Sequence, residues 1–496
     1  MHWIDLLVFL IYMIVILGVG LYFMRRNKGD EDYFLAGRSM SYPHIGLSVV
    51  ATDVGGGFSI GLGGLGFLLG MSGSWMLFTG LLGAWLSAVF LIPKVKNLST
   101  EQRFFTMPQL FGYFYSPAAA LVAGVISAVG YIGFTSSQML AGAKLASASF
   151  PELSLIHALY IMGFIIVVYT VMGGIKAVIY TDTFQWALLM FGLIFIGIPI
   201  AWHAVGGYEV IAATLPASFL RLDSISWYDF FNWCITIMPI WFVGMTLYQR
   251  IYASRSEKEA QKAWYLAGLF EWPIMAFMGV LLGLLARVAA EQGMFASLGF
   301  ASAEGMDAEM GLPLLLSTVL PIGFMGLMMS AYFSAVMSTA DSCLVAASGN
   351  VVTDILRKGL GFRNRAVADI RLSQLVTLAL GALALGIAAM FENVLDIMLW
   401  SYAFMVSGLL VPVLGALYWG RGTPAGAVAA MIGGGLVTVW LSLSPPELLD
   451  TRLDPNLYGI LTSALLFILI SLTGGDRHST ASKPEKTLQK SSGQKI

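Results

Sequence analysis

Charged side chains are scarce in this sequence, and their scarcity excludes a soluble protein. Asp, Glu, Lys and Arg make up 11% of the 496 residues, while hydrophobic residues make up 58%. Soluble domains contain about 25% charged residues. A soluble chain this apolar could not cover its surface with polar groups, whereas lipid accepts apolar side chains. We therefore predict an all-α integral membrane protein.

The features that most enzymes and nucleic-acid-binding proteins need are also missing. The net charge of −1 gives no electrostatic reason for nucleic acid to bind. The two cysteines, Cys234 and Cys343, are far apart and fit neither a disulfide framework nor a metal site, so buried thiols are predicted. The glycines at 55–57 are not followed by the Gly-Lys-Ser/Thr of a phosphate-binding loop. We predict no catalytic residues.

Long apolar stretches recur along the whole chain. Each is long enough to cross a bilayer, which takes about 20 residues. They predict thirteen transmembrane helices, at 3–24, 44–70, 72–93, 118–148, 154–173, 182–204, 228–248, 263–289, 319–349, 369–391, 395–419, 424–443 and 457–473. The polar segment 474–496 predicts a disordered tail.

The basic residues predict the orientation of these helices. With the N-terminus outside, all of the 27 Lys and Arg residues except Lys144, Arg221, Arg287 and Arg452 belong to segments on the inside. This asymmetry is what the positive-inside rule requires. We predict a multi-pass protein of the plasma membrane, specifically a bacterial inner membrane, with a cytoplasmic C-terminus.

The second predicted span contains Asp53 beside the glycines at 55–57. Glycine is a poor helix former, so these residues predict an unwound segment in mid-membrane. Discontinuous helices of this kind form substrate and ion sites in transporters. The alternative is close helix packing through small residues, but a carboxylate at this depth favours a functional break.

The ninth predicted span carries hydroxyls and a carboxylate on one face. Ser334, Ser338, Asp341 and Ser342 are spaced i, i+4, i+7 and i+8. Such hard oxygen ligands suit a small cation. Hydrogen bonds from Ser and Thr to their own helix are the alternative, but they do not account for the buried Asp341.

Two further places in the membrane interior are unusual. Asp182, at the inner end of the sixth span, is by itself best explained as a helix N-cap. The seventh span contains Pro239 and Gly244, which predict a second interrupted helix. Two broken helices five spans apart indicate an inverted repeat with a binding site between its halves. Aromatic residues nearby could line a pocket or mark the membrane interface; they are Phe58, Trp75, Phe78 and Trp241.

This repeat divides the chain into five parts. They are a peripheral helix and loop at 1–43, a first five-helix repeat at 44–204, a second at 228–419, two peripheral helices at 424–473, and the tail at 474–496.

Taken together, these stretches resemble the sodium/solute symporter family over residues 5–475. The most specific segments are DYFLAGRS at 32–39, ATDVGGG at 51–57, GGIKAVIYTDTFQ at 173–185, YQR at 248–250 and AVMSTADS at 335–342. The resemblance implies a leucine-transporter-type fold, a 5+5 inverted repeat with extra helices at both ends, and alternating access.

The resemblance also implies ion ligands. It places a sodium site at the residues Ala51, Val54, Ala335, Ser338 and Thr339. A second site, found in some members of the family, corresponds to Asp182, Ser338, Asp341 and Ser342. Asp341 departs from the sialic acid transporter, which has a hydroxyl there. On this basis Asp182 is a candidate ligand as well as a candidate cap, and Na⁺ is the expected ion.

The substrate is less defined. The predicted substrate-contacting residues are Asp53, Gly57, Phe58, Phe78, Gln138 and Trp241. The tryptophan cage of choline transporters is missing, because Asp53, Gly133 and Gly244 stand at the matching positions. A small amino acid or organic acid is the expected solute.

We therefore predict a secondary active transporter, functional as a monomer, that couples inward sodium movement to the uptake of a small organic solute. Proton coupling and an uncoupled facilitator of the same fold remain alternatives, because the buried aspartates could carry protons.

Overall fold

A computed structural model describes most of the chain. The described residues are 2–24, 35–53, 55–150, 152–172, 175–359, 361, 366–446 and 449–473.

Within these ranges the chain is helical, without a β-sheet, and a single isolated bridge joins Met40 and Ser254. The α-helices are α1 (Trp3–Met24), α3 (Tyr42–Asp53), α4 (Gly56–Leu69), α5 (Trp75–Phe90), α6 (Ile92–Glu101), α7 (Pro108–Phe114), α8 (Pro117–Ser149), α9 (Leu155–Met172), α10 (Ile175–Gly192), α11 (Ile198–Ala204), α12 (Gly207–Thr214), α13 (Trp227–Val243), α14 (Met245–Ala253), α15 (Glu257–Leu269), α16 (Ala276–Glu291), α17 (Ala308–Val319), α18 (Phe324–Gly349), α19 (Ala366–Ala388), α20 (Val394–Tyr418), α21 (Pro424–Leu443) and α22 (Pro455–Thr473). Short 3₁₀ or π turns are η1 (Ala36–Arg38), η2 (Gly70–Ser74), η3 (Leu193–Gly197), η4 (Ala217–Leu220), η5 (Phe270–Met275), η6 (Ala296–Leu298) and η7 (Asn350–Gly359).

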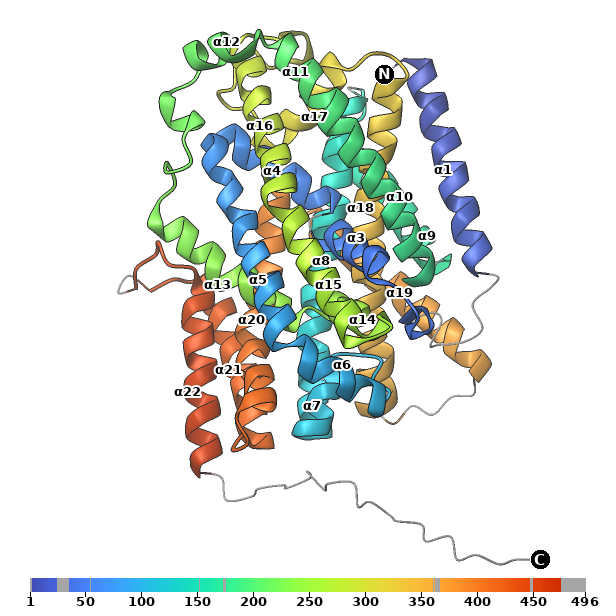
Figure 1. Cartoon of the computed structure of the whole chain (residues 1–496), viewed down its shortest axis with the longest axis vertical. Coiled ribbons are helices and arrows are strands. Elements are labelled where there is room, and N and C mark those ends of the chain that lie inside the picture. Colours follow the sequence, from blue (N-terminus) through green and yellow to red (C-terminus); the bar gives the residue numbers. More distant parts are fainter. Residues whose placement is uncertain are drawn as a thin grey trace, which may run out of the picture.

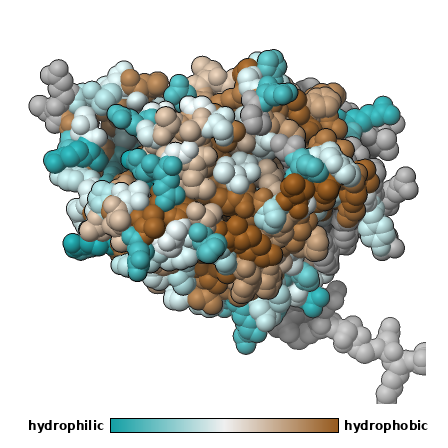
Figure 2. All heavy atoms as spheres, turned by 90° about the horizontal axis from the view of Figure 1, so that it is seen from above, coloured by the Kyte–Doolittle hydropathy of each residue, from teal (hydrophilic) through white to brown (hydrophobic). Residues whose placement is uncertain are grey.

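The helices form one bundle with two ends (Figure 1). The upper end holds the start of α1, together with α12 and the start of α17, and the lower end holds α6, α7 and the end of α22. Seen from above, hydrophilic residues are scattered among hydrophobic ones (Figure 2). By length and composition, nine helices of the described residues could cross a membrane, or ten if one bent pair is a single span.

Each of the predicted apolar stretches coincides with a helix or a broken helix. The prediction of an all-α fold with membrane-spanning helices is therefore confirmed. The count of thirteen spans and the inverted repeat remain predictions.

The centre of the bundle is α18. In its most apolar stretch, 94% of the residues are buried. The helix packs against α8, α10, α1 and α19. A helix buried all round needs no polar face, yet α18 carries hydroxyls and Asp341 there. Its polar atoms must therefore find partners within the protein.

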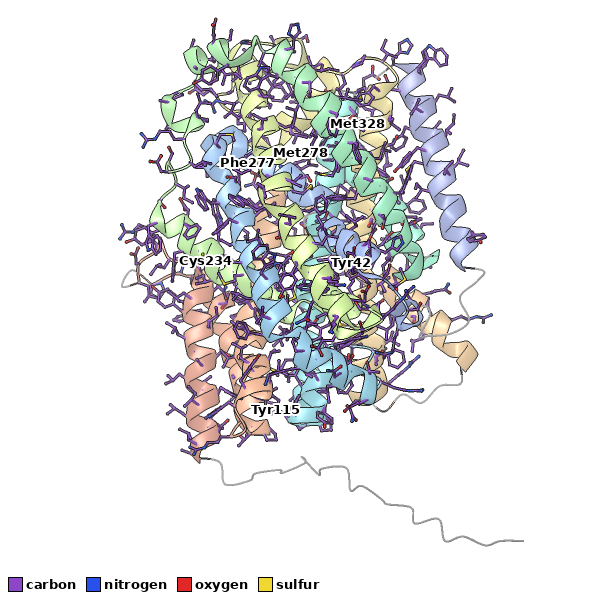
Figure 3. The ribbon with its side chains drawn as sticks, in the orientation of Figure 1. Tyr42, Tyr115, Cys234, Phe277, Met278 and Met328 are labelled. Atoms are coloured by element: carbon purple, nitrogen blue, oxygen red, sulfur yellow. The ribbon has the colours of Figure 1, made fainter. Side chains whose placement is uncertain are left out.

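The two free cysteines lie on different helices. Cys343 is buried in α18, as predicted, whereas Cys234 (labelled in Figure 3) is only half-buried in α13.

Candidate functional site

The second span is broken at the predicted place. Helix α3 ends at Asp53 and α4 begins at Gly56, and Gly55 between them has φ +34°. A side chain at Gly55 would meet the Thr339 hydroxyl at 2.3 Å. Glycine is therefore required both by the backbone conformation and by the close approach of α18.

Thr339 joins the break to α18. Its Oγ1 lies 3.1 Å from the carbonyl oxygen of Ala51 on α3 and 3.1 Å from that of Ala335 one turn back on α18. Three oxygens from two helices thus converge at the break. The structure brings together Ala51, Ala335 and Thr339 as expected, while Val54 lies outside the described residues.

Asp182 is the second point at which the helices converge. Its carboxylate accepts hydrogen bonds from Ser338 on α18 and from Ser48 on α3, the latter at 2.7 Å. The Arg250 guanidinium of α14 lies 3.6 Å away. Asp182 lies inside α10, which begins at Ile175, so the N-cap interpretation is wrong.

Asp341 and Ser342 extend this cluster along α18. Thr170 of α9 donates to Oδ1 of Asp341, while Oδ2 has no hydrogen-bond partner among the described residues. Ser342 accepts a hydrogen bond of 3.1 Å from Arg250. The predicted second ion site therefore already receives a positive charge from the protein.

Arg250 is a residue whose position the sequence did not reveal. The charge pattern places it in an inner loop, but the structure buries it completely in α14, just after the break at Gly244. Besides Asp182 and Ser342 it donates to Ser48 and Thr52 on α3. The guanidinium thereby connects α3, α10, α14 and α18.

The second break is also confirmed. Helix α13 ends at Val243, α14 begins at Met245, and the two are bent by 42° at Gly244. The hydroxyl of Tyr131 on α8 accepts a hydrogen bond of 3.1 Å from the backbone N–H of Thr246, in the first turn after the break. A side chain on α8 therefore satisfies a backbone donor that the interrupted helix leaves free.

The predicted substrate residues fall into two groups. In the first, the Gln138 amide oxygen accepts from the N–H of Gly57 at 3.0 Å, and Tyr402 of α20 donates to Asp53 at 3.4 Å. The two contacts lie on either side of the break, at the start of α4 and at the end of α3 respectively. The side chain of Phe58 lies outside the described residues.

In the second group, Phe78 belongs to α5, and Trp241 of α13 packs against α5. Phe78 is in edge contact with Trp272, with the ring centroids 5.2 Å apart. Trp241 is fully buried against Trp264, and it packs where Gly83 leaves room on α5. The structure does not record a contact from either residue to Asp53.

Glu271 links the two groups, and the sequence analysis overlooked it. It lies in η5 between α15 and α16, is fully buried, and interacts directly with the Asp53 side chain. A side chain at Gly80 of α5 would meet its Oε2 at 2.3 Å. The signal was present, because an ionisable residue within a predicted span calls for a functional explanation.

The lower end of the bundle contains a different buried cation. Lys96 of α6 donates to the carbonyl oxygens of Tyr252, at 3.0 Å, and Ser254, at 2.5 Å. Burial, together with the nearby positive charge of Arg38, lowers the pKa of Lys96 to about 8. These contacts fix α6 to the end of α14.

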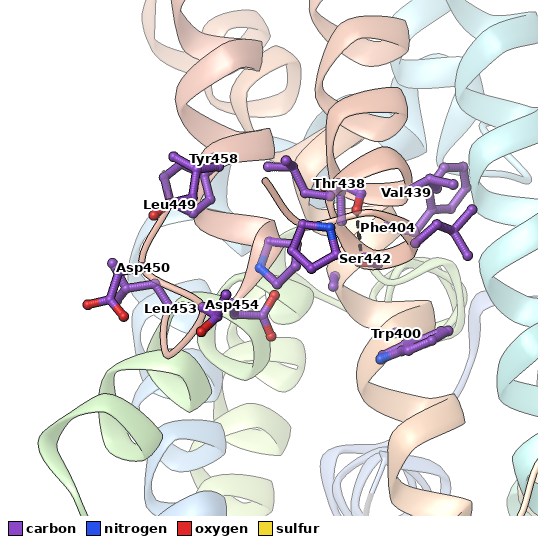
Figure 4. Close-up of a pocket in the computed structure, with 16 residues that line it drawn as sticks. Trp400, Phe404, Thr438, Val439, Ser442, Leu449, Asp450, Leu453, Asp454 and Tyr458 are labelled. Carbon is purple, nitrogen blue, oxygen red and sulfur yellow. Dashed lines mark hydrogen bonds between the residues drawn. The ribbon is translucent and has the colours of Figure 1, made fainter. Parts of the chain in front are cut away.

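The surface also carries a groove between α20, α21 and the loop before α22 (Figure 4). It has a volume of about 310 Å³, and Trp400, Thr438 and Tyr458 are among its lining residues. None of the lining residues belongs to the clusters around Asp53 or Asp182, so this groove is separate from the candidate site.

Comparison with known proteins gives consistent results. A model of the sodium:solute symporter family matches residues 33–434. The chain is 26% identical to a sodium/glucose cotransporter of Vibrio parahaemolyticus, covering 95% of this chain and 91% of that protein. It is 27% identical to a sodium/proline symporter of Escherichia coli, covering 88% and 87%.

Solved structures show the same fold. A Na⁺-coupled sialic acid symporter in a substrate-bound outward-open state has a TM-score of 0.77 at 21% identity, covering 95% of this chain and 98% of that one. Mhp1, a nucleobase-cation-symport-1 family transporter in a closed conformation, has a TM-score of 0.56 at 13% identity, covering 90% and 94%. The family predicted from the sequence motifs is confirmed: the chain belongs to the sodium:solute symporter family.

Proposed function

We propose that this protein couples the inward movement of sodium to the uptake of a small organic solute by alternating access. Membership of the family makes it a sodium-dependent membrane transporter and not an enzyme. The observation that carries the coupling is the position of Thr339, whose hydroxyl lies between the carbonyls of Ala51 and Ala335. The proposal thus places sodium at the junction of the broken helix and α18.

The chemistry of this junction suits Na⁺. Carbonyl and hydroxyl oxygens are the ligands that hard cations prefer, and carbonyls freed by a discontinuous helix coordinate sodium in transporters. We place Ala51, Ala335 and Thr339 in the site, with Val54 and Ser338 as further ligands. A bound ion would hold α3 and α4 against α18. The membrane potential would favour its entry by ~2.3 kcal/mol per charge per 100 mV.

A second ion position is proposed around Asp182, Ser338, Asp341 and Ser342. The unpartnered Oδ2 of Asp341 supports it, because a buried carboxylate oxygen without a donor is costly. Arg250 already supplies positive charge to Asp182 and Ser342. This position is therefore expected to hold an ion more weakly than the junction at Thr339.

The solute is proposed to bind beside the break in the second span. Asp53, Gly57 and Gln138 lie there, while Phe78 lies on α5 and Trp241 on α13. If sodium fixes this break, each ligand raises the affinity of the other by the same factor. Coupling then follows from one shared structural element.

The remaining proposals concern the whole chain. We propose a multi-pass monomer of a bacterial inner membrane with its N-terminus outside, so that the upper end in Figure 1 faces outward. The segments 44–204 and 228–419 would be the two halves of the repeat, a leucine-transporter-type arrangement, and the two breaks support this division.

The decisive experiment is uptake by the full chain in proteoliposomes. A panel of labelled metabolites is offered with and without an inward sodium gradient, and separately with an inward proton gradient. Sodium must stimulate the uptake of at least one solute. Stimulation by protons alone would support the proton-coupled alternative, and equal uptake without any gradient would support an uncoupled facilitator.

Thr339 provides a matched pair of variants. Thr339→Val keeps the shape of the side chain but removes the hydroxyl, whereas Thr339→Ser keeps the hydroxyl. We expect Thr339→Val to raise the sodium concentration for half-maximal uptake by about tenfold or more, the loss of a charge-assisted contact. Thr339→Ser should change it little. Identical sodium dependence in both variants would remove this ion site.

A further inference from the structure

Among the described residues, Glu271 is a buried acid without a partner that could neutralise it. It is fully buried, and neither of its carboxylate oxygens has a hydrogen-bond donor among the described residues. The group it faces is another acid, Asp53. Two ionised carboxylates repel each other unless a shared proton or a bound cation lies between them.

Among the described residues, the buried cations near the Asp53–Glu271 pair are too few to neutralise the buried acids. Two pairs of buried acids lie in the bundle: Asp53 interacts with Glu271, and Asp182 interacts with Asp341. The buried cations of the described residues are Lys96, Lys144 and Arg250. Lys96 donates to backbone carbonyls near the lower end of the bundle. Its positive charge therefore does not compensate any of the four acids.

Lys144 does not compensate these four acids either, because it forms ion pairs with two other acids. It pairs with Asp307 at 2.6 Å and with Glu309 at 2.7 Å. Of the buried cations among the described residues, Arg250 alone lies near these acids: it is 3.6 Å from Asp182, and its charge also acts on Asp53. An uncompensated buried charge is costly, so the Asp53–Glu271 pair needs either a proton or a bound cation.

The glycine opposite the pair keeps this space open. A Cβ at Gly80 of α5 would lie 2.3 Å from Oε2 of Glu271. The chain leaves the helix at Trp272, next to Glu271, with φ −136° and ψ 125°. Interruptions of this kind in otherwise helical segments are frequent at functional sites.

Aromatic rings connect the pair to the surface. Trp272 is stacked with Trp75, with the ring centroids 6.1 Å apart, and Phe277 (labelled in Figure 3) lies 5.8 Å from Trp272. Trp75 in turn lines a groove of about 410 Å³, together with Phe230. Aromatic faces attract cations, so this groove favours positive charge at the surface near Trp272.

From this geometry we propose that the Asp53–Glu271 pair binds a protonated nitrogen of the transported solute, a primary ammonium or a guanidinium. This inference rests on the proposed function and narrows its substrate class. A protonated nitrogen supplies both N–H donors and positive charge to carboxylate oxygens that lack donors, whereas a quaternary ammonium has no N–H group and fits poorly. An amino acid fits through its ammonium, whereas an organic acid without an amine does not.

The experiment uses the purified full chain in nanodiscs with sodium present. The probes are arginine, agmatine and n-butylamine as N–H cations, n-butanol and glucose as neutral compounds, and choline as a quaternary ammonium. Binding is read as the shift in unfolding temperature and by calorimetry. We expect at least one N–H cation to bind, and the neutral and quaternary probes to bind about tenfold more weakly or not at all.

Two variants locate the binding. Glu271→Gln keeps the shape and removes the charge, and it should weaken the N–H cation by about tenfold or more. Glu304→Gln, an exposed acid on a loop, should leave binding unchanged. The selectivity of the unmodified chain needs no variant, so misfolding of Glu271→Gln would not remove the test.

The outcomes separate this inference from the proposed function. Equal binding of neutral and N–H probes, no binding of any N–H probe, or unchanged binding in Glu271→Gln would overturn the inference. Sodium-driven uptake of a neutral solute at an unchanged rate in Glu271→Gln would also overturn it while leaving sodium coupling intact. The failure of every solute to respond to sodium would instead reject the proposed function.

Discussion

Two buried acidic clusters in this bundle are neutralised in different ways. Around Asp182, the protein supplies the partners itself: Ser48, Ser338 and the Arg250 guanidinium all lie within reach. Around Glu271, none of the described residues donates to the carboxylate, and the neighbouring group is Asp53.

This difference distinguishes carboxylates that the protein itself neutralises from carboxylates that need a bound ligand to neutralise them. A buried carboxylate paired with arginine holds helices together whether or not a ligand is bound. A buried carboxylate without a donor is costly until a cation arrives. The first cluster is therefore expected to determine the stability of the bundle, and the second to determine what it binds.

The largest expected effect comes from breaking the first cluster. Arg250→Ala leaves the Asp182 carboxylate buried without its cation, which typically costs about 3–5 kcal/mol. Thermal unfolding of the purified protein in detergent measures this loss.

Two further variants test the cause. The double variant Arg250→Ala/Asp182→Asn should be more stable than Arg250→Ala alone, because it removes the unpaired charge as well. Arg221→Ala breaks an exposed ion pair with Asp223 and should change little. If Arg250→Ala were as stable as Arg221→Ala, the structural role of the first cluster would be refuted.

A smaller effect, confined to binding, is expected when the second cluster is disturbed. Gly80→Ala places a methyl group where Oε2 of Glu271 lies, so the carboxylate must move. We expect uptake to fall about tenfold or more, because displacement of a charged contact changes binding by 1.4 kcal/mol or more. The sodium concentration for half-maximal uptake should change much less.

Gly386→Ala is the matched control for this substitution. Gly386 also lies within a helix, α19, but a Cβ there has no atom within 4 Å. Uptake should be preserved. Equal losses in the two variants would mean that the helix backbone, rather than the position of Glu271, determines the effect.

The smallest expected effect concerns a third buried charge, Lys96, which faces carbonyls instead of carboxylates. Its pKa is lowered from 10.5 to about 8 in the folded protein, so between these values the unfolded chain binds more protons. Stability should therefore rise with pH across this window.

Lys96→Met has no such group, so its unfolding temperature relative to the unmodified protein should fall as the pH increases from 8 to 10. A difference that stays constant with pH would show that the burial of Lys96 imposes no cost on its charge. This result would place Lys96 with the exposed lysines instead of with the buried charges.

Much of the candidate site was predicted from the sequence. The break beside Asp53 followed from three consecutive glycines, and the break at Gly244 from a glycine close to Pro239. The convergence of Ala51, Ala335 and Thr339 followed from the resemblance to the family. These features depend on short segments, whose local conformation and motifs can be read directly.

Three features required the tertiary structure. Arg250 was assigned to a loop because a cation near the end of an apolar run is usually exposed there. Asp182 was taken alone for a cap because its position within α10 depends on where that helix starts. Glu271 was overlooked because its partner, Asp53, lies far away in the sequence.

Composition, glycine positions and family motifs were enough to identify a helical membrane protein of the sodium:solute symporter family with two interrupted helices. Hydrophobic length, glycine content and family motifs are local properties, so they survive without coordinates. Which buried charges neutralise each other, and which do not, became visible in the three-dimensional arrangement of the helices. That outcome depends on distances of a few ångströms between helices, because the interaction between charges in a low-dielectric interior is strong only at close range.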